Sequence, residues 1–360
     1  MNKLREASIN LILANQADSG GYVASPNFRV YRYSWYRDGA FIAHAIAKVG
    51  HNESAMRFHN WAAENIIIRA DQISRLIQKR NDGIEIHPEE HLHCRYTLDN
   101  KESQEEWTNY QLDGFGTWIW SVDEFFKMGN PRENKYIQAT ELLIPYLSTF
   151  WRDGQFDWWE ESFGHQHVST IGSIAAGLQR CSTWPEISVE LRDLAFKTAK
   201  EIREFVLSKG VHNGHLTKWI GTNEVDGSLA ALISPLGFIE ADSPIAKATI
   251  DQIRENLGLL GTHRHLKDVY FGGGEWLILS SFLALSLLEN DDMKSAQEVL
   301  LWIESQSDEN NELPEQVDEN LLFPEAKDDW VAKWGESAKP LLWSHAMYLL
   351  LQNELSKVLI

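Results

Sequence analysis

The spacing of apolar residues constrains the fold of this 360-residue chain more than any other feature, because such residues recur at i, i+3, i+4 and i+7 through most of its length. This period matches one face of an α-helix, whereas the strict alternation typical of strands is rare. The segment 114–128 carries one such stripe and is followed by Gly129, a residue suited to helix ends. Its members are Phe115, Trp118, Ile119, Val122, Phe125 and Phe126. The sequence therefore predicts an all-α protein.

Two kinds of helix alternate along the chain. The segment 191–206 has one apolar stripe and a charged opposite side, which is typical of an outer helix. The segments 40–47, 171–178 and 276–288 are apolar almost all round, so we expect them to be enclosed by protein. About a dozen helices in alternating pairs predict an (α/α)6 toroid of six inner and six outer helices, with a helical solenoid as the alternative. No linker divides the chain, so we expect residues 1–360 to form a single domain.

Composition excludes several classes of function. The 52 acidic residues outnumber the 33 basic residues and give a net charge of -19, which disfavours binding to nucleic acid or to anionic membranes. The first 16 residues read as an amphipathic helix without the features of a secretory signal, so we expect a cytoplasmic protein. Cys94 and Cys181 are too few for a disulfide framework. We expect a monomer or a weak homo-oligomer.

Polar and aromatic clusters precede the predicted inner helices, including one expected near residue 228. Six such loops would converge on one rim, and their planar faces, amides and charges suit a neutral, hydroxyl-rich ligand. The chain also has 15 tryptophans, and many of them lie in these loops. The clustered residues include Tyr31, Trp35, Arg37 and Asp38; Trp107, Gln111 and Asp113; Asp157, Trp158, Trp159, Glu160 and Glu161; Trp219, Asn223 and Glu224; Arg264, Asp268, Tyr270, Glu275 and Trp276; and Glu315, Gln316 and Trp343.

One carboxyl group in these clusters is suited to donate a proton. Cleavage of a glycosidic bond needs one protonated and one ionised carboxyl group. Glu160 follows two tryptophans and precedes Glu161, and both apolar neighbours and a nearby negative charge raise a carboxyl pKa. A helix N-terminus nearby would act in the opposite sense. Taken alone, the Glu160–Glu161 pair fits the acidic first turn of a helix better than a catalytic site. Arg37–Asp38 fits a salt bridge at a helix start as well as it fits a substrate contact.

Metal and nucleotide cofactors are not indicated by the sequence. Three H-x-H pairs occur, at 91–93, 165–167 and 263–265, but none has the H-x-x-x-H or cysteine spacing of a zinc site. The GGG run at 272–274 lacks the Lys and Ser/Thr of a phosphate loop. We therefore expect no cofactor and no metal, with the loop histidines contacting hydroxyl or backbone groups.

Six ordered blocks span most of the chain: YRYSWYRDGAF (31–41), WTNYQLDGFG (107–116), FDWWEE (156–161), RHLKDVYFGGGEW (264–276), LPEQV (313–317) and LLWSHA (341–346). Together they resemble glycoside hydrolase family 15, the glucoamylase and glucodextranase family. The resemblance implies that Glu160 is the general acid and Glu315 the general base. It implies that sugar is bound by Arg37, Asp38, Trp107, Glu161, Arg264 and Trp276, with Tyr31 near the reaction centre.

The resemblance implies an inverting, exo-acting α-glucoside hydrolase that releases β-glucose from non-reducing ends. Family members often carry a β-sandwich domain or a starch-binding module, for which this chain has no room, so we expect short substrates such as isomaltose, isomalto-oligosaccharides or malto-oligosaccharides. Trp158 stands where many members have leucine, which leaves the preferred linkage open. The alternatives are a trehalase or another α-glucoside hydrolase of the same fold, a sugar epimerase or phosphorylase, and a non-catalytic sugar-binding toroid.

Overall fold

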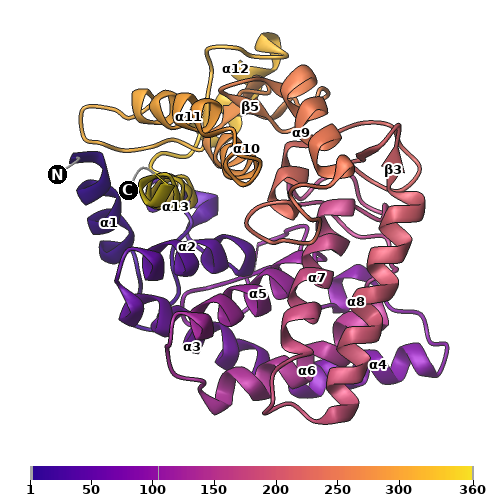
Figure 1. Ribbon diagram of the computed structural model, residues 1–360. Helices are drawn as coiled ribbons and strands as arrows, with labels where there is room; N and C mark the ends of the chain where they lie inside the picture. The colour runs from indigo at the N-terminus through magenta and orange to yellow at the C-terminus, as the bar shows by residue number, and fades with distance from the viewer. Residues whose placement is uncertain (1–2, 104, 359–360) are drawn as a thin grey trace.

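Six helical elements form a closed inner ring in the computed structural model, which describes residues 3–103 and 105–358 (Figure 1). In the order α2, α5, α7, η3, α10, α13, each element packs against the next, and α13 returns to α2. Side chains on these elements are buried on nearly every face, as predicted for enclosed helices. Because the last element contacts the first, the ring is a toroid and not an open solenoid. The bounds are Tyr36–Lys48 (α2), Asp113–Lys127 (α5), Val168–Cys181 (α7), Gly227–Leu232 (η3), Leu277–Glu289 (α10) and Leu342–Val358 (α13).

An outer layer of helices covers this ring. α1 packs on α13, α3 on α2, α6 on α3 and α5, α8 on α7, α9 on η3, and α11 on α10. Each outer helix buries one apolar stripe and exposes residues on its opposite side, which confirms the predicted (α/α)6 architecture. The two ends of the chain lie near each other, where α1 meets α13 (Figure 1). The bounds are Lys3–Ala14 (α1), Asn52–Ile67 (α3), Asn134–Phe150 (α6), Val189–Lys209 (α8), Pro244–Leu257 (α9) and Met293–Ser305 (α11).

One inner position differs from the prediction. The segment expected to form an α-helix near residue 228 is the six-residue 3-10 helix η3, Gly227–Leu232. Pro235 follows closely, and proline removes a backbone donor and disfavours helical geometry in the residue before it, here Ser234. The chain therefore turns after η3, although all six residues of η3 remain buried within the ring.

Short sheets and helices occupy the connections. Strands β1 and β2 pair antiparallel, as do β3 and β4, while β5, β6 and β7 form a three-stranded sheet. An Asn-Gly turn joins β3 to β4, with positive φ at Asn213 and Gly214. The bounds are Ser34–Trp35 (β1), Arg95–Tyr96 (β2), Val211–His212 (β3), His215–Leu216 (β4), Thr262–His263 (β5), Glu275–Trp276 (β6), Gln316–Val317 (β7), Ala70–Asn81 (α4), Lys327–Trp334 (α12), Arg29–Tyr31 (η1), Pro88–Glu90 (η2), Tyr270–Gly272 (η4) and Pro324–Ala326 (η5).

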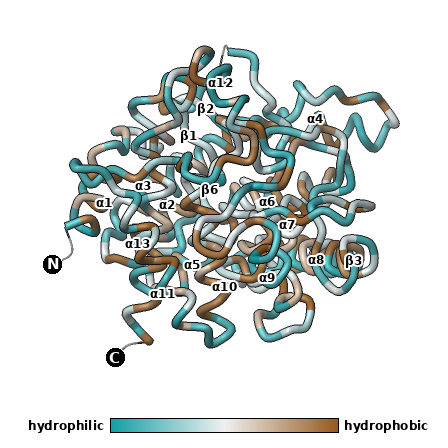
Figure 2. Tube along the Cα trace, turned by 90° about the horizontal axis from the view of Figure 1, so that it is seen from above, coloured by the Kyte–Doolittle hydropathy of each residue, from teal (hydrophilic) through white to brown (hydrophobic). Residues whose placement is uncertain are grey.

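Two of these strands lead directly into inner helices, β1 into α2 and β6 into α10. Seen from above, β1, β2 and α12 lie in the same part of the molecule (Figure 2). The beginnings of several inner helices are thereby placed beside the connections that carry the polar clusters. In the described part of the chain, no helix has the length and apolar character needed to cross a bilayer.

Candidate active site

A cavity of about 390 Å³ opens where the inner helices α2, α10 and α13 begin. This volume is near the lower end of the range for small-molecule sites. Most of the site residues predicted from sequence meet here, and they come from connections far apart in the chain. Those that line the cavity are Tyr31, Trp35, Arg37, Asp38, Trp107, Trp159, Glu160, Glu161, Arg264, Trp276, Glu315 and Trp343.

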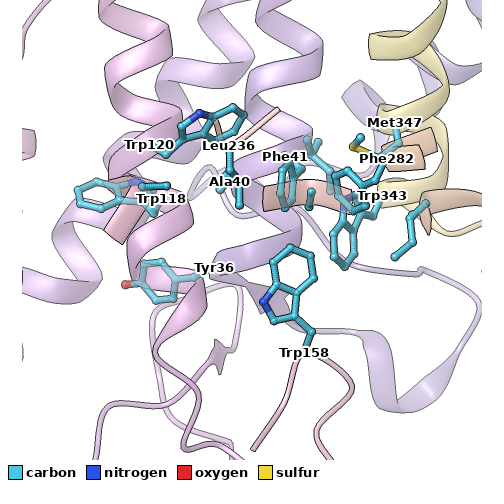
Figure 3. Close-up of a cluster of buried hydrophobic side chains, with 14 of the residues drawn as sticks. Tyr36, Ala40, Phe41, Trp118, Trp120, Trp158, Leu236, Phe282, Trp343 and Met347 are labelled. Atoms are coloured by element: carbon cyan, nitrogen blue, oxygen red, sulfur yellow. The ribbon is translucent and has the colours of Figure 1, made fainter. Parts of the chain in front are cut away.

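The floor of the cavity is a packed aromatic cluster (Figure 3). Phe41 stacks on Trp343 with ring centroids 5.5 Å apart, and Trp158 lies 6.2 Å from Trp343. Phe282 of α10 packs against both tryptophans. Sequence reasoning did not place Trp158 among the binding residues, although it recognised the unusual tryptophan at this position. The cluster closes one end of the cavity with apolar faces.

Arg37 and Asp38 lie beside this floor, in the first turn of α2 and not in the loop before it. The Arg37 guanidinium donates to Asp113 at 2.7 Å, to Gln111 at 2.9 Å and to the backbone carbonyl of Trp158 at 2.7 Å. Gln111 and Asp113 therefore do not line the cavity, and they hold Arg37 from behind. Burial raises the pKa of Asp38 to about 7, against the lowering effect of Arg37.

A tight turn presents Glu160. The Asp157 carboxylate accepts hydrogen bonds from the backbone N–H of Trp159 at 3.0 Å and of Glu161 at 2.8 Å. Glu160 has φ of 66°, a left-handed conformation that is costly for a residue with a side chain. Strained backbone held by surrounding structure is typical of functional sites. The helix α7 begins only at Val168, so Glu160 is not in the first turn of a helix.

The Glu160 side chain is half-buried, and specific donors hold its carboxyl group. The indole N–H of Trp35 donates to Oε1 of Glu160 at 2.6 Å, and the Cys94 thiol lies 3.8 Å from the same oxygen. Burial raises the pKa of Glu160, and the charge of Arg37 with the Trp35 hydrogen bond offsets part of this effect. The carboxyl group is thus biased toward the protonated form that a proton donor requires.

Glu315 enters the cavity from the residue before β7, which pairs with β6 and so brings it beside Trp276. Its backbone N–H donates to the carbonyl of Ala338 at 2.9 Å, and the Ser337 hydroxyl lies 3.4 Å from Oε2. Burial raises the pKa of Glu315 to about 8, although hydrogen bonding to Tyr31 and the charge of Arg264 act in the opposite direction.

Two tyrosines accompany Glu315. The hydroxyl groups of Tyr31 and Tyr270 lie 3.0 Å apart, and both side chains line the cavity. Sequence reasoning named Tyr270 in a polar cluster but did not select it as a binding residue. Its position follows from η4, which turns back toward the cavity between β5 and β6.

Arg264 and Glu161 form the opposite wall. The Arg264 guanidinium binds Asp268, with Nε to Oδ2 at 2.7 Å, and also lies 3.0 Å from Oε1 of Glu161. Burial opposes ionisation of Glu161, but Arg264 and His265 outweigh it and lower its pKa to about 2. Glu161 is therefore an ionised acceptor at the cavity edge, next to a fixed cation.

Glu275 was predicted to belong to the site, but the structure places it outside the cavity. It is buried in β6, but its carboxylate faces Gly261 and accepts hydrogen bonds from Asn320 at 3.2 Å, outside the cavity lining. Successive side chains of a strand point to opposite faces, so the presence of Trp276 in the cavity directs Glu275 away from it. Glu275 is therefore not among the residues that line this cavity.

A buried ion cluster that sequence reasoning missed supports the Glu160 turn. Lys218 lies 3.1 Å from Asp226 and 3.5 Å from Asp157, and the indole N–H of Trp159 donates to Asp226 at 3.0 Å. Lys218 lies just after the β3–β4 hairpin, so no local sequence pattern relates it to the 156–161 block. Sequence reasoning also missed Trp330, Lys333 and Trp334 of α12, which line the cavity mouth.

The histidine pairs contact hydroxyl and backbone groups. His91 lies 3.0 Å from the Tyr146 hydroxyl, His167 donates from Nε2 to the Ser162 carbonyl at 3.0 Å, and His263 donates from Nδ1 to the Gly273 carbonyl at 3.0 Å. Within residues 3–103 and 105–358, no group of three or more His, Cys, Asp or Glu side chains is arranged to hold a metal ion.

Comparison with known proteins gives consistent matches over the whole length. The family model described as Glycosyl hydrolases family 15 matches residues 3–307. The chain is 37% identical to an isomaltose glucohydrolase of Kribbella flavida, over 99% of this chain and 93% of that protein. A trehalase of Thermoplasma volcanium is 23% identical over 80% of this chain and 48% of its own length.

Solved structures agree with this result. A structure titled as a wild-type glycosidase superposes with a TM-score of 0.96 at 37% identity, covering 98% of this chain and 96% of that one. A related structure with the same scores is a glycosidase variant in complex with glucose. A bacterial glucoamylase complexed with acarbose, at 17% identity, covers 98% of this chain and 55% of that one with a TM-score of 0.74 and shares the fold.

Proposed function

Because the chain belongs to glycosyl hydrolases family 15, we propose that it is an inverting, exo-acting α-glucoside hydrolase acting on isomaltose and related short oligosaccharides. In this proposal residues 1–360 act as a single catalytic domain. The substrate class is supported by the likeness over nearly the full length to a protein named isomaltose glucohydrolase. It is also supported by a cavity of about 390 Å³, which suits a small ligand.

Glu160 is the general acid in this mechanism. Its raised pKa keeps a proton available for the glycosidic oxygen, and the leaving sugar departs as a neutral alcohol. Trp35 donates to Oε1 of Glu160 and Gln111 also hydrogen-bonds this carboxyl group, so both donors orient it. The left-handed turn and its support by Asp157 fix the direction in which the carboxyl group points.

Glu315 is the general base. It removes a proton from a water molecule that attacks the anomeric carbon from the side opposite the leaving group, which inverts an α-linkage to β-glucose. Hydrogen bonding to Tyr31 and Ser337 and the charge of Arg264 favour the ionised form that this step needs. Burial opposes ionisation of Glu315 and raises its pKa to about 8, so the ionised base becomes more populated as the pH rises toward that value. We expect a bell-shaped profile of kcat/KM against pH, with its alkaline limb near pH 8.

The closed floor accounts for the exo action. Apolar ring faces of Trp158 and Trp343 accept the faces of a pyranose, and the adjacent Arg37 and Asp38 supply a donor and an acceptor for its hydroxyl groups. A sugar seated there has no room for a further residue beyond its non-reducing end. Each reaction therefore removes one terminal glucose unit.

The observation that carries the proposal is the meeting of half-buried Glu160 and buried Glu315, two carboxyl groups with raised pKa values, in one cavity closed at one end. Hydrolysis of isomaltose, maltose and trehalose, followed by proton NMR, tests it. We expect the first product from isomaltose to be β-glucose. Glu160→Gln and Glu315→Gln should each lower kcat by about 10²–10⁴-fold. Release of α-glucose, or full activity in either variant, would contradict the assignment.

A further inference from the structure

The short helix α12, Lys327–Trp334, stands at the mouth of the cavity and has no buried residue of its own. It packs on η4 and η5, and Trp330 lies 5.0 Å from the Tyr270 ring and 6.1 Å from Phe271. Three of its side chains line the cavity, namely Trp330, Lys333 and Trp334. The helix therefore presents two half-buried indole rings to the cavity, and such rings suit a ligand that has both apolar faces and hydroxyl groups.

Both ends of the segment that carries α12 lie beside Glu315. It leaves through β7 directly after this residue and returns at Ser337, whose hydroxyl lies 3.4 Å from the Glu315 carboxylate. The Glu315 N–H also binds the Ala338 carbonyl at 2.9 Å. On the way, the backbone N–H of Phe323 donates to Gly272 at 2.9 Å. The position of α12 over the mouth is therefore fixed relative to the carboxyl group that we assign as the base.

The cavity has a gradient from apolar floor to open mouth. Trp158 and Trp343 at the floor are buried, whereas Trp330 and Trp334 are half-buried and Lys333 is exposed. Glu160 and Glu315 line the same cavity as both groups of tryptophans. If the glucose unit that is cleaved off sits on the floor, the second sugar must lie toward α12. Lys333 lies 5.3 Å from the Trp330 ring and 4.9 Å from the Trp334 ring, which places a hydrogen-bond donor between two stacking surfaces.

We propose that α12 binds the leaving-group sugar and thereby selects short substrates. This inference rests on the proposed function and adds the residues that decide what lies beyond the bond cleaved. Trp330 and Trp334 offer flat apolar faces for the second pyranose, and Lys333 donates to its hydroxyl groups. Since the helix covers part of the mouth, it also restricts where a third sugar can lie.

The test compares two substrates that differ only in the leaving group. Isomaltose has a second sugar to place on α12, whereas α-glucosyl fluoride has none and needs the floor and the carboxyl pair alone. In Trp330→Ala we expect kcat/KM for isomaltose to fall about tenfold, with that for α-glucosyl fluoride changed less than about twofold. Trp330→Phe keeps a flat ring and should recover most of the loss. The preference for isomaltose over isomaltotetraose should also weaken in Trp330→Ala.

A matched control lies on the same helix. Asp329 is exposed and does not line the cavity, so Asp329→Asn should leave both rates unchanged. Equal losses on both substrates in Trp330→Ala, or no loss on isomaltose, would overturn the inference. Thermal unfolding followed by circular dichroism shows whether a variant is folded, and Trp334→Ala provides an independent substitution if Trp330→Ala is not. Failure of the unmodified enzyme to hydrolyse either substrate would instead refute the proposed function.

Discussion

Replacing Glu315 by glutamine should stabilise the protein at alkaline pH while removing its proposed base. The pKa of this carboxyl group rises from 4.5 to about 8 on folding because burial disfavours its charge. Between these values the folded state binds more protons than the unfolded state, so the free energy of unfolding falls as pH rises. At 1.36 kcal/mol per pKa unit, the penalty above pH 8 is about 5 kcal/mol as an order of magnitude. Glutamine has nearly the same shape and no charge, so it avoids this penalty.

Urea unfolding followed by tryptophan fluorescence at a series of pH values measures the effect. At pH 4 the Glu315 carboxyl group is mostly protonated in both the folded and the unfolded protein, so the variant should match the unmodified protein in stability. The difference should grow from about pH 4.5 and level off above about pH 8, with the variant more stable. A stability difference that is constant with pH, or a less stable variant at pH 9, would refute the reasoning about burial. The expected result would also show that the buried carboxyl group, which the proposed reaction requires, lowers the stability of the folded protein.

Three further predictions, one of them with a control variant, test other parts of the structure. The pKa of Glu161 is lowered to about 2, so the stability that its charge contributes is present above pH 4.5 and is lost as the pH falls toward 2. In the same urea assay, Glu161→Gln should therefore lower the free energy of unfolding by about 1–2 kcal/mol at pH 7 and by little at pH 2. The loss at pH 7 is reduced by solvent screening, because the Glu161 side chain is 39% exposed. Trp35→Phe removes the 2.6 Å hydrogen bond to Glu160, so the limb of the kcat/KM profile that reports Glu160 should move up by about one pH unit. Trp107→Phe is the matched control, since its indole N–H has no partner among the described residues and the limb should stay in place. Gly116→Ala should lower the melting temperature and reduce the free energy of unfolding by about 3 kcal/mol, because the added Cβ would lie 2.4 Å from a backbone oxygen of α7. An unchanged melting temperature would show that α5 and α7 can move apart to make room for it.

The sequence by itself determined the helical class and the alternation of inner and outer helices. These follow from local patterns: all-round apolar segments such as 276–288 must be enclosed, and single-stripe segments such as 191–206 must cover them. It did not determine that η3 would be a 3-10 helix, because the six residues Gly227–Leu232 are apolar enough for either geometry. Their conformation depends on how the chain turns within a nearly closed ring.

The sequence also identified most of the cavity-lining residues, because each stands in a distinctive local block. It could not separate residues that face the cavity from those one position away. Trp276 and Glu275 adjoin in β6, and only the pairing with β5 and β7 decides which side chain points inward. Similarly, Gln111 and Asp113 hold Arg37 from behind, a distinction that requires the α2–α5 packing.

Tertiary structure alone decided which distant groups act on the two carboxyl groups. Lys218 supports the Glu160 turn from a hairpin about 60 residues away, and α12 covers the mouth although no sequence signal relates it to the floor. The pKa values of Glu160 and Glu315 depend chiefly on burial, and burial is a property of the closed ring as a whole. Local residue patterns specify helices and candidate groups, whereas the electrostatic character of a site exists only once distant segments have excluded water from it.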